Sequence, residues 1–148
     1  MAPAVEVLKE FAIEYEVVVA SAHRTPGKVH EFAEEAAGRG VGVIIAAAGA
    51  AAHLPGVVAA YTTLPVIGVP VNSTSLGGMD ALLSIAQMPA GIPVACMAIN
   101  GAKNAGLFAA QILSTSSPSL QRKFRAYRKT MAEQVEKKAQ KLAAKLEG

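Results

Sequence analysis

Apolar positions recur along the chain in two patterns, one typical of helices and one typical of buried strands. Apolar residues three or four positions apart, with charged residues between them, predict helices over residues 2–14, 25–39, 54–61, 77–86, 102–113 and 118–146. Continuous runs of β-branched and small apolar residues predict strands over residues 15–20, 41–47, 65–69 and 93–99. Strands that alternate with helices predict an α/β fold with a mostly parallel sheet.

The chain has the length of one domain. Its 148 residues contain no internal repeat and no linker, so we expect a single domain over residues 1–148. Hydrophobic residues make up 52% and charged residues 17%, which is apolar for a free monomer of this size. The excess apolar surface favours burial in a homo-oligomer.

The net charge of +3 and the pI of about 9.1 raise the question of a nucleic-acid partner. Ten of the fourteen Lys and Arg residues follow residue 100, and most alternate with Glu133 and Glu136 on the predicted C-terminal helix. That pattern is typical of a solvated helix face, and 5% aromatic residues leave little for base stacking. We therefore expect no nucleic-acid partner.

The single cysteine, Cys96, excludes an internal disulfide and favours the reducing cytoplasm. Its apolar surroundings predict a small core residue rather than a nucleophile. The N-terminus does not resemble a signal peptide, and the apolar runs fall short of the roughly 20 residues of a membrane span. We expect a cytoplasmic protein without a membrane partner.

Polar residues follow three of the four predicted strands, and a Gly/Ala run follows the other. The segments are 21–24, 47–50, 72–80 and 100–104. Because ligands of doubly wound sheets bind beyond the carboxyl ends of the strands, these segments are the candidate site. They lack a Walker lysine motif, a dinucleotide glycine fingerprint and a metal-ligand cluster, so the sequence predicts neither a cofactor nor a metal.

Each candidate side chain has a functional and a structural interpretation. His23 can move protons near neutral pH or simply cap a loop, whereas Arg24 beside it suits a phosphate or carboxylate. His53 either faces the same cleft or is a satisfied core histidine. Lys103 either reaches a phosphate or is solvated. His30 is predicted to be a surface residue, and Asp80 a helix-surface or capping residue rather than a catalytic acid.

The small residues from Ala46 to Ala52 also have two interpretations. They allow tight packing between subunits, and they let backbone N–H groups approach an anion.

Several segments occur together in the order and near the spacing of one known family. They are Ser21-Ala-His-Arg-Thr-Pro26, Ala51-Ala-His-Leu-Pro-Gly56, Pro65-Val-Ile-Gly-Val-Pro70, Leu76-Gly-Gly-Met-Asp80, Gln87-Met-Pro89, Gly91-Ile-Pro-Val94 and Asn104-Ala-Gly-Leu107. From about residue 4 to the mid-120s, the chain resembles the class I N5-carboxyaminoimidazole ribonucleotide mutases of purine biosynthesis.

The resemblance implies a three-layer flavodoxin-like domain that assembles as an octamer, with helix 118–146 packing in the oligomer. It implies conversion of N5-carboxyaminoimidazole ribonucleotide to 4-carboxy-5-aminoimidazole ribonucleotide without a cofactor or a metal. The carbamate loses CO2 in a closed site, the ring carbon is recarboxylated, and a histidine moves the protons. An ATP-dependent carboxyaminoimidazole ribonucleotide synthase is the implied functional partner.

The resemblance also implies roles for individual residues. His23 matches the catalytic histidine. The residues that match substrate-binding positions are Ser21, Ala22, Arg24, Ala47, Ala48, Gly49, His53 and Leu54. Arg24 lies on the phosphate side, and residues 47–49 form the loop over the reacting carboxyl group.

The chain departs from the family at its beginning. Family members begin with a strand and a Gly-Ser-x-Ser-Asp loop, whereas here only three residues precede the segment that matches the family's first helix. In the flavodoxin-like strand order the absent strand lies between residues 15–20 and 41–47. We expect either a gap there or direct pairing of the two neighbours. The alternatives to an active mutase are an assembly protein without catalysis and an ordinary flavodoxin-like nucleotide-binding or regulatory domain.

Overall fold

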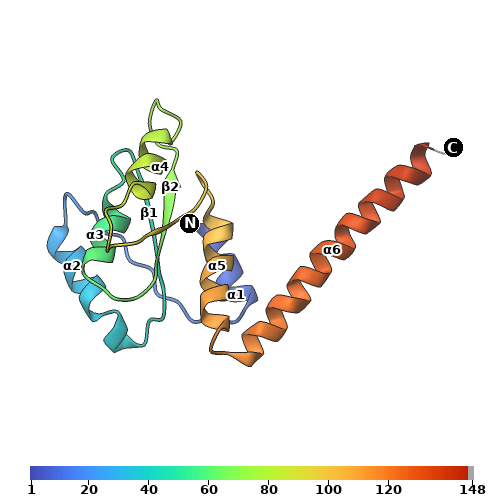
Figure 1. The fold of residues 1–148 in the computed structure, drawn as a ribbon, viewed down its shortest axis with the longest axis horizontal. Coiled ribbons are helices and arrows are strands. Elements are labelled where there is room, and N and C mark those ends of the chain that lie inside the picture. The colour runs from blue at the N-terminus through green and yellow to red at the C-terminus, as the bar shows by residue number, and fades with distance from the viewer. Residues whose placement is uncertain (147–148) are drawn as a thin grey trace.

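The computed structural model describes residues 1–146, which form a three-stranded parallel sheet with helices on both faces and a projecting C-terminal helix (Figure 1). The strands are β1 (Ile44–Gly49), β2 (Val66–Val71) and β3 (Ala95–Cys96), in the spatial order β1-β2-β3. Ile44 lies opposite Val66, and Ile67 lies opposite Ala95. The predicted α/β class and parallel pairing are confirmed.

The helices follow the predicted order. They are α1 (Ala2–Glu10), α2 (Pro26–Glu35), the 3₁₀ turn η1 (Ala37–Arg39), α3 (Leu54–Ala60), α4 (Met79–Ala86), α5 (Ala102–Ser114) and α6 (Pro118–Leu146). Thr25 precedes α2 and Pro26 begins it, as predicted. Gly40 follows η1 with a φ of 85°, the left-handed conformation that glycine adopts most readily at a helix end.

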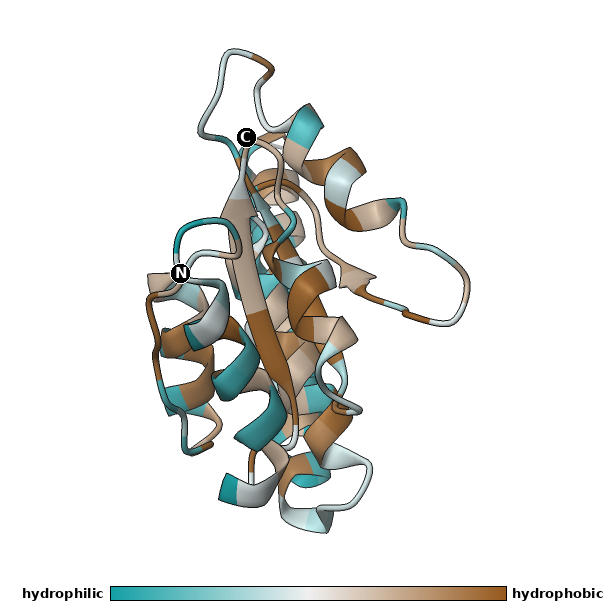
Figure 2. Cartoon of the chain, turned by 90° about the vertical axis from the view of Figure 1, so that its left-hand side faces the viewer, coloured by the Kyte–Doolittle hydropathy of each residue, from teal (hydrophilic) through white to brown (hydrophobic). Residues whose placement is uncertain are grey.

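The sheet is the middle of three layers, and its strands are apolar on both faces (Figure 2). Ile44 and Val66 pack with α2 and α3 on one face. Ile67 and Val69 pack with α1 and α5 on the other face. Burial on both faces explains why the strand sequences are continuous apolar runs.

Helix α6 leaves the body after its first turns (Figure 1). Its partly buried residues Leu120, Phe124 and Tyr127 pack around Phe11, which is 2% exposed. Lys123 Nζ donates a 2.9 Å hydrogen bond to the carbonyl of Phe11, just beyond the end of α1. Residues 131–146 are all exposed, so α6 is anchored to the body by its N-terminal third.

One predicted strand is wrong. Residues 15–20 are extended but unpaired, and Val17 and Val19 are 70% and 87% exposed. Within residues 1–146 the N–H groups of residues 14–20 donate no backbone hydrogen bond. An extended segment becomes a strand only when a neighbour supplies backbone hydrogen-bond partners, and none of residues 1–146 supplies them to this segment. Of the two expected outcomes, the structure therefore shows the gap.

Two smaller differences concern the ends of predicted elements. Helix α1 ends at Glu10 instead of residue 14, and Ala12 turns the chain with a φ of 55°. Strand β3 keeps only Ala95 and Cys96 of the predicted residues 93–99, and it pairs with β2 alone among the described residues. In the part of the chain that the structure describes, no helix is both long and apolar enough to span a membrane.

Candidate functional site

Two histidines from separate segments meet at the carboxyl edge of the sheet. His23 follows the extended segment, and His53 follows β1 and precedes α3. Nε2 of His23 lies 2.7 Å from Nδ1 of His53, within hydrogen-bond distance. The rings are 4.9 Å apart between centroids and nearly perpendicular, at 87°. Both histidines are exposed, so the pair can meet a ligand.

The loop that carries His23 is held by Ser21 and Thr25. The Ser21 N–H donates to Thr25 Oγ1 at 2.8 Å, and the Thr25 N–H donates to the Ser21 carbonyl at 2.9 Å. The Arg24 N–H donates to Ser21 Oγ at 3.3 Å. The Thr25 side chain does not cap α2, because its hydroxyl closes this loop instead. The loop therefore presents His23 and Arg24 outward from a fixed base.

His53 occupies the N-cap position of α3. Ala50 precedes it with a φ of 52°, an uncommon conformation for a residue with a Cβ. The His53 N–H donates to the Ala51 carbonyl at 2.8 Å, and the His53 carbonyl accepts from the Val57 N–H at 2.9 Å. Backbone contacts on both sides thus fix the position of this residue, and the exposure of His53 favours the site interpretation over the core one.

The Gly/Ala loop after β1 packs against the loop after β2. A Cβ built on Gly49 would overlap Ser73 Oγ and lie 2.9 Å from Ser73 Cβ. Only glycine fits there without movement of the neighbouring loop. Ala47 and Ala48 are half-buried and pack against opposite faces of the sheet. The small residues therefore bring two loops of the carboxyl edge together.

Side-chain hydrogen bonds also join the loops after β2 and β3. The Asn72 N–H donates to Asn100 Oδ1 at 3.1 Å. Thr74 Oγ1 donates to Asp80 Oδ2 at 2.9 Å, while Asp80 Oδ1 is buried without a hydrogen-bond partner among residues 1–146. The sequence marked these segments as polar but did not reveal which residues contact each other. Ser73, Asn72 and Asn100 were therefore missed as residues that shape the site.

The other predicted site residues lie partly at the carboxyl edge of the sheet and partly in the core or on the surface. Ala22 lies in the His23 loop, and Leu54 begins α3 and packs on the core. The Arg24 guanidinium makes no hydrogen bond or ion pair within the described residues, so it is available to an anion. His30 is exposed, as predicted, and pairs with Glu34 at 3.3 Å.

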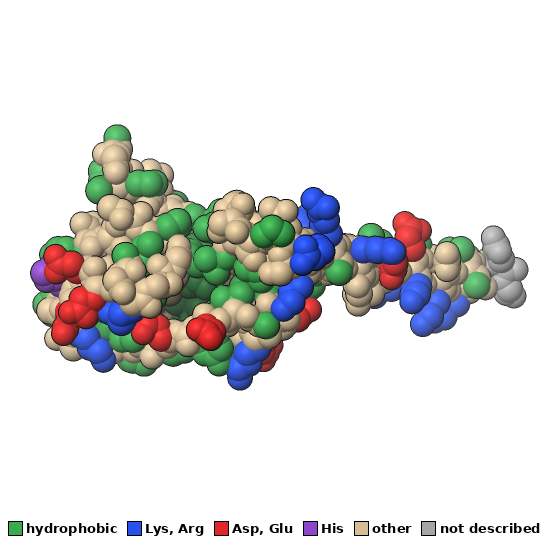
Figure 3. Space-filling view, turned by 90° about the horizontal axis from the view of Figure 1, so that it is seen from below, with side chains coloured by type: hydrophobic (Ala, Val, Ile, Leu, Met, Phe, Trp, Pro, Cys, Tyr) green, Lys and Arg blue, Asp and Glu red, His purple; other side chains and the backbone are tan. Residues whose placement is uncertain are grey.

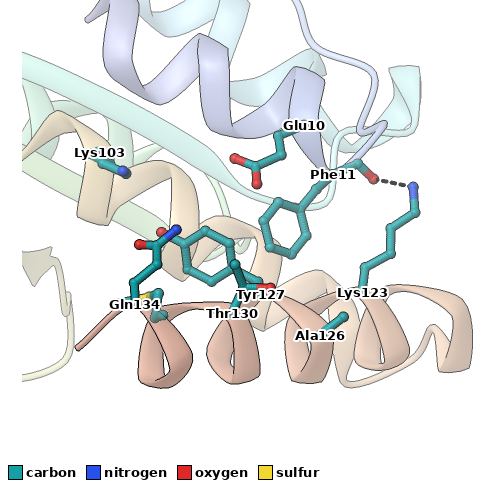
Figure 4. A pocket seen from close by; sticks show the side chains of 9 residues that line it. Glu10, Phe11, Lys103, Lys123, Ala126, Tyr127, Thr130 and Gln134 are labelled. Atoms are coloured by element: carbon teal, nitrogen blue, oxygen red, sulfur yellow. Dashed lines mark hydrogen bonds between the residues drawn. The ribbon is translucent and has the colours of Figure 1, made fainter. Parts of the chain in front are cut away.

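Lys103 lies in the first turn of α5. It lines a cavity of about 580 Å³ between α1 and α6, together with Glu10, Tyr127 and Gln134 (Figure 4). Neither interpretation of Lys103, as a phosphate ligand or as a solvated lysine, is tested by this position, and both stay predictions.

Cys96 is a half-buried core residue beside Ile85 and Val94, as predicted. Burial raises the pKa of its thiol above the usual value of 9.0. Residues 1–146 contain no group of three or more His, Cys, Asp or Glu side chains that could hold a metal ion.

The fold and the site together define a doubly wound α/β protein with a small-molecule site at the carboxyl edge of its sheet. The chain belongs to the AIR carboxylase family, whose profile matches residues 1–134.

Individual relatives agree with this assignment. The chain is 55% identical over 142 residues to the N5-carboxyaminoimidazole ribonucleotide mutase of Thermotoga maritima, covering 96% of this chain and 83% of the relative. It is 54% identical over 149 residues to the N5-carboxyaminoimidazole ribonucleotide mutase of Mycobacterium tuberculosis. That alignment covers 99% of this chain and 86% of the relative. Among solved structures, Treponema denticola PurE superposes with a TM-score of 0.85 at 29% identity, covering 95% of this chain and 88% of that one.

Proposed function

We propose that this chain converts N5-carboxyaminoimidazole ribonucleotide to 4-carboxy-5-aminoimidazole ribonucleotide, a step of purine biosynthesis. The observation that carries the proposal is the 2.7 Å contact between His23 and His53 at the carboxyl edge of the sheet. It occurs in a chain 55% identical to a protein named for this reaction.

The reaction moves one carboxyl group and needs no net oxidation or reduction. The bond between the exocyclic nitrogen and the carboxyl carbon breaks, and that nitrogen gains a proton as CO2 leaves. The ring carbon then attacks CO2, and the ring loses one proton. His23 is the group that moves these protons, because an imidazole both donates and accepts near neutral pH. His53 supports it by fixing which nitrogen of His23 carries hydrogen.

The remaining candidates bind the substrate. The unpaired Arg24 guanidinium suits the phosphate, since its planar donors match an anion. The backbone at the end of β1, at Ala47, Ala48 and Gly49, lies against the carboxyl group that migrates, and the small side chains leave room for it. A pocket of this kind holds CO2 close to the ring carbon and keeps water away.

Closure of the site points to a homo-oligomer. His23 and His53 are exposed in the single chain, and free CO2 would escape from such an open edge. Large apolar residues near the edge are also exposed: Leu76 by 64%, Met79 by 50% and Leu83 by 51%. Exposed apolar clusters of this kind are typical of subunit interfaces. We propose that neighbouring subunits, in an octamer, cover this surface.

The test is turnover of the carbamate ribonucleotide, followed by the absorbance of the carboxylated product. We expect a rate above the spontaneous one that falls by about 10²–10⁴-fold in His23→Asn. His30→Asn is the matched control, because His30 is an exposed histidine paired with Glu34, and we expect full activity. No turnover by the unsubstituted protein in an intact assembly would contradict the proposal and support an assembly protein without catalysis.

A further inference from the structure

Asp80 lies in the first turn of α4, but its carboxyl group serves another element. Helix α4 has no hydrogen bond from a capping side chain, and Asp80 Oδ2 instead accepts from Thr74 Oγ1 at 2.9 Å. Asp80 Oδ1 is buried and has no hydrogen-bond partner among residues 1–146. An acidic residue in a first helical turn is favourable, but a buried and unpaired carboxyl oxygen lowers stability. The burial of this group therefore calls for a role other than support of the helix.

Helix α4 is a fixed support beside the candidate site. Ala81 and Ile85 are 0% exposed, and the half-buried Ala48 at the end of β1 packs against their core cluster. Asp80 directly precedes Ala81, so its backbone cannot shift without repacking that cluster. The hydrogen bond from Thr74 is thus attached to a rigid part of the fold.

The loop after β2, residues 72–78, projects from the sheet between β2 and α4 (Figure 1). At its start, the Asn72 N–H donates to Asn100 Oδ1 at 3.1 Å. Beyond Asn72, the bond from Thr74 to Asp80 is the only side-chain hydrogen bond within residues 1–146 that joins this loop to another element. It therefore determines where the middle of the loop lies.

Ser73, next to Thr74, packs against the end of β1. Gly49 is paired with Val71 in the neighbouring strand, so the residues that follow Val71 meet Gly49 at the carboxyl edge of the sheet. A Cβ built on Gly49 would overlap Ser73 Oγ and lie 2.9 Å from Ser73 Cβ. Contacts therefore run from Asp80 through Thr74 to the residue that packs on Gly49. Gly49 belongs to the segment that the proposed function places against the migrating carboxyl group.

We propose that Asp80 is a positioning residue for the carboxyl transfer: through Thr74 it holds residues 72–78 closed against Gly49 and keeps the released CO2 in the site. The inference rests on the proposed function. Asp80 itself moves no proton and contacts no reacting atom. Without its hydrogen bond, the loop withdraws, and the CO2 formed when the nitrogen–carbon bond breaks escapes before the ring carbon attacks it. CO2 is neutral and weakly bound, so its retention depends on this closure.

The test follows the migrating carboxyl group by an isotope. The carbamate ribonucleotide carries carbon-13 in that group, and the buffer contains unlabelled bicarbonate in excess. Mass spectrometry at early times measures the fraction of product without the label, after subtraction of the exchange that occurs without protein. This fraction reports how often CO2 escaped and was replaced. It is unaffected by loss of folded protein, because unfolded molecules form no product.

Two variants remove the hydrogen bond from opposite sides. With Asp80→Ala and with Thr74→Val, which keeps the shape of threonine without its hydroxyl, we expect the unlabelled fraction to rise about tenfold. The double variant should lose no more label than either single variant, because both remove the same contact.

Two further variants are the controls. Thr74→Ser keeps the hydroxyl and should retain the label as the unsubstituted protein does. Ser84→Ala removes a different side-chain hydrogen bond of α4, the 2.7 Å bond from Ser84 Oγ to the Asp80 carbonyl, and should also retain the label. The body of the molecule exposes hydrophobic side chains (Figure 3), so light scattering checks the assembly of every variant.

Amide hydrogen exchange tests the loop without substrate. The Leu76 N–H donates to Thr74 Oγ1 at 3.3 Å, and the Gly77 N–H donates to the Thr74 carbonyl at 3.3 Å. In Asp80→Ala these two amides should exchange at least about threefold faster. The amide of Asn72, at the start of the loop, should keep its rate.

The outcomes separate this inference from the proposed function. Equal label retention in all variants of a protein that forms product overturns the inference alone, as does unchanged exchange of Leu76 and Gly77 in Asp80→Ala. Label loss confined to variants with smaller assemblies assigns the effect to a subunit interface and also overturns it. No product from the unsubstituted protein instead contradicts the proposed function, on which the role of Asp80 rests.

Discussion

Nε2 of His23 and Nδ1 of His53 lie 2.7 Å apart, although thirty positions separate the two residues in the sequence. At this distance only one hydrogen fits between the facing nitrogens, so one ring donates and the other accepts. Each ring therefore fixes the tautomer and orientation of the other. Protonation of both facing nitrogens breaks the contact.

This coupling predicts non-additive effects of substitution on catalysis. We expect His23→Asn to lower kcat by about 10²–10⁴-fold, since it removes the group that moves protons. His53→Asn should lower kcat by about 10-fold or more, with a smaller change in KM, because His23 loses its orienting partner. The double variant should be no slower than His23→Asn alone. Steady-state kinetics of the three variants and the unsubstituted protein provide the double-mutant cycle.

If the loss of kcat in the double variant equals the product of the losses in the two single variants, the two rings do not act together. The control is again His30→Asn. His30 packs against Tyr61, with the rings tilted by 50° and their centroids 4.3 Å apart, and it pairs with Glu34. Its loss therefore tests only the general effect of removing an imidazole.

Gly49 gives a prediction about stability. We expect Gly49→Ala to lower the free energy of unfolding by about 1–3 kcal/mol, because the new Cβ overlaps Ser73 Oγ and lies 3.1 Å from the Val71 carbonyl. Gly27→Ala is the matched control: Gly27 lies in α2, and a Cβ there meets nothing within 4 Å. It should be neutral or slightly stabilising. Urea denaturation measures the unfolding free energy of Gly49→Ala, of Gly27→Ala and of the double variant Gly49→Ala/Ser73→Gly.

If Ser73→Gly does not reduce the loss of unfolding free energy caused by Gly49→Ala, that loss does not come from the contact between the new Cβ and Ser73. Equal stability of Gly49→Ala and Gly27→Ala would contradict the close packing of the two loops.

The sequence predicted those elements whose patterns depend on neighbours close in the chain. The start of α2 at Thr25-Pro26 and the end of the following turn η1 at Gly40 follow from local backbone preferences. The core strands β1 and β2 follow from continuous apolar runs. Residues 15–20 are also rich in β-branched residues, but strand formation depends on a partner far away in the sequence, and among residues 1–146 this segment pairs with none.

The site could be predicted in outline for a similar reason. Topology alone brings the ends of parallel strands to one edge, so His23 and His53 were expected near each other. Their direct contact, the fit of Gly49 against Ser73 and the bond from Asn72 to Asn100 depend on loop conformations. No pattern in the sequence encodes those conformations. The turn of Lys103 toward α6 likewise depends on where α6 packs.

Helix α6 predicts two different effects of truncation. A chain ending at residue 130 should keep its unfolding free energy within about 1 kcal/mol as a monomer, since residues 131–146 are exposed. A chain ending at residue 117 loses the cover of Phe11 by Phe124 and Tyr127 and the Lys123 hydrogen bond, and should lose about 3 kcal/mol or more. Urea denaturation at low protein concentration measures the unfolding free energies of the two truncated chains and of the full chain.

The same truncations test the oligomer. If the exposed part of α6 packs against other subunits, the chain ending at residue 130 should form smaller assemblies than the full chain. Light scattering after size-exclusion chromatography measures the mass. Assemblies of equal subunit number would show that residues 131–146 are not needed for association.

Cys96 provides a prediction about reactivity and pH. Burial raises the pKa of its thiol, so the thiolate is scarcer in the folded protein than in the unfolded chain at neutral pH. We expect a disulfide reagent to react with the native protein at least about tenfold more slowly than with the protein in urea. Because the folded state holds this proton more tightly, the associated stability is present below the unfolded pKa and is lost as the pH rises through the raised value. Cys96→Ala should therefore flatten the alkaline part of a plot of unfolding free energy against pH. Equal reaction rates in the native and unfolded protein would contradict the burial of Cys96 beside Ile85 and Val94.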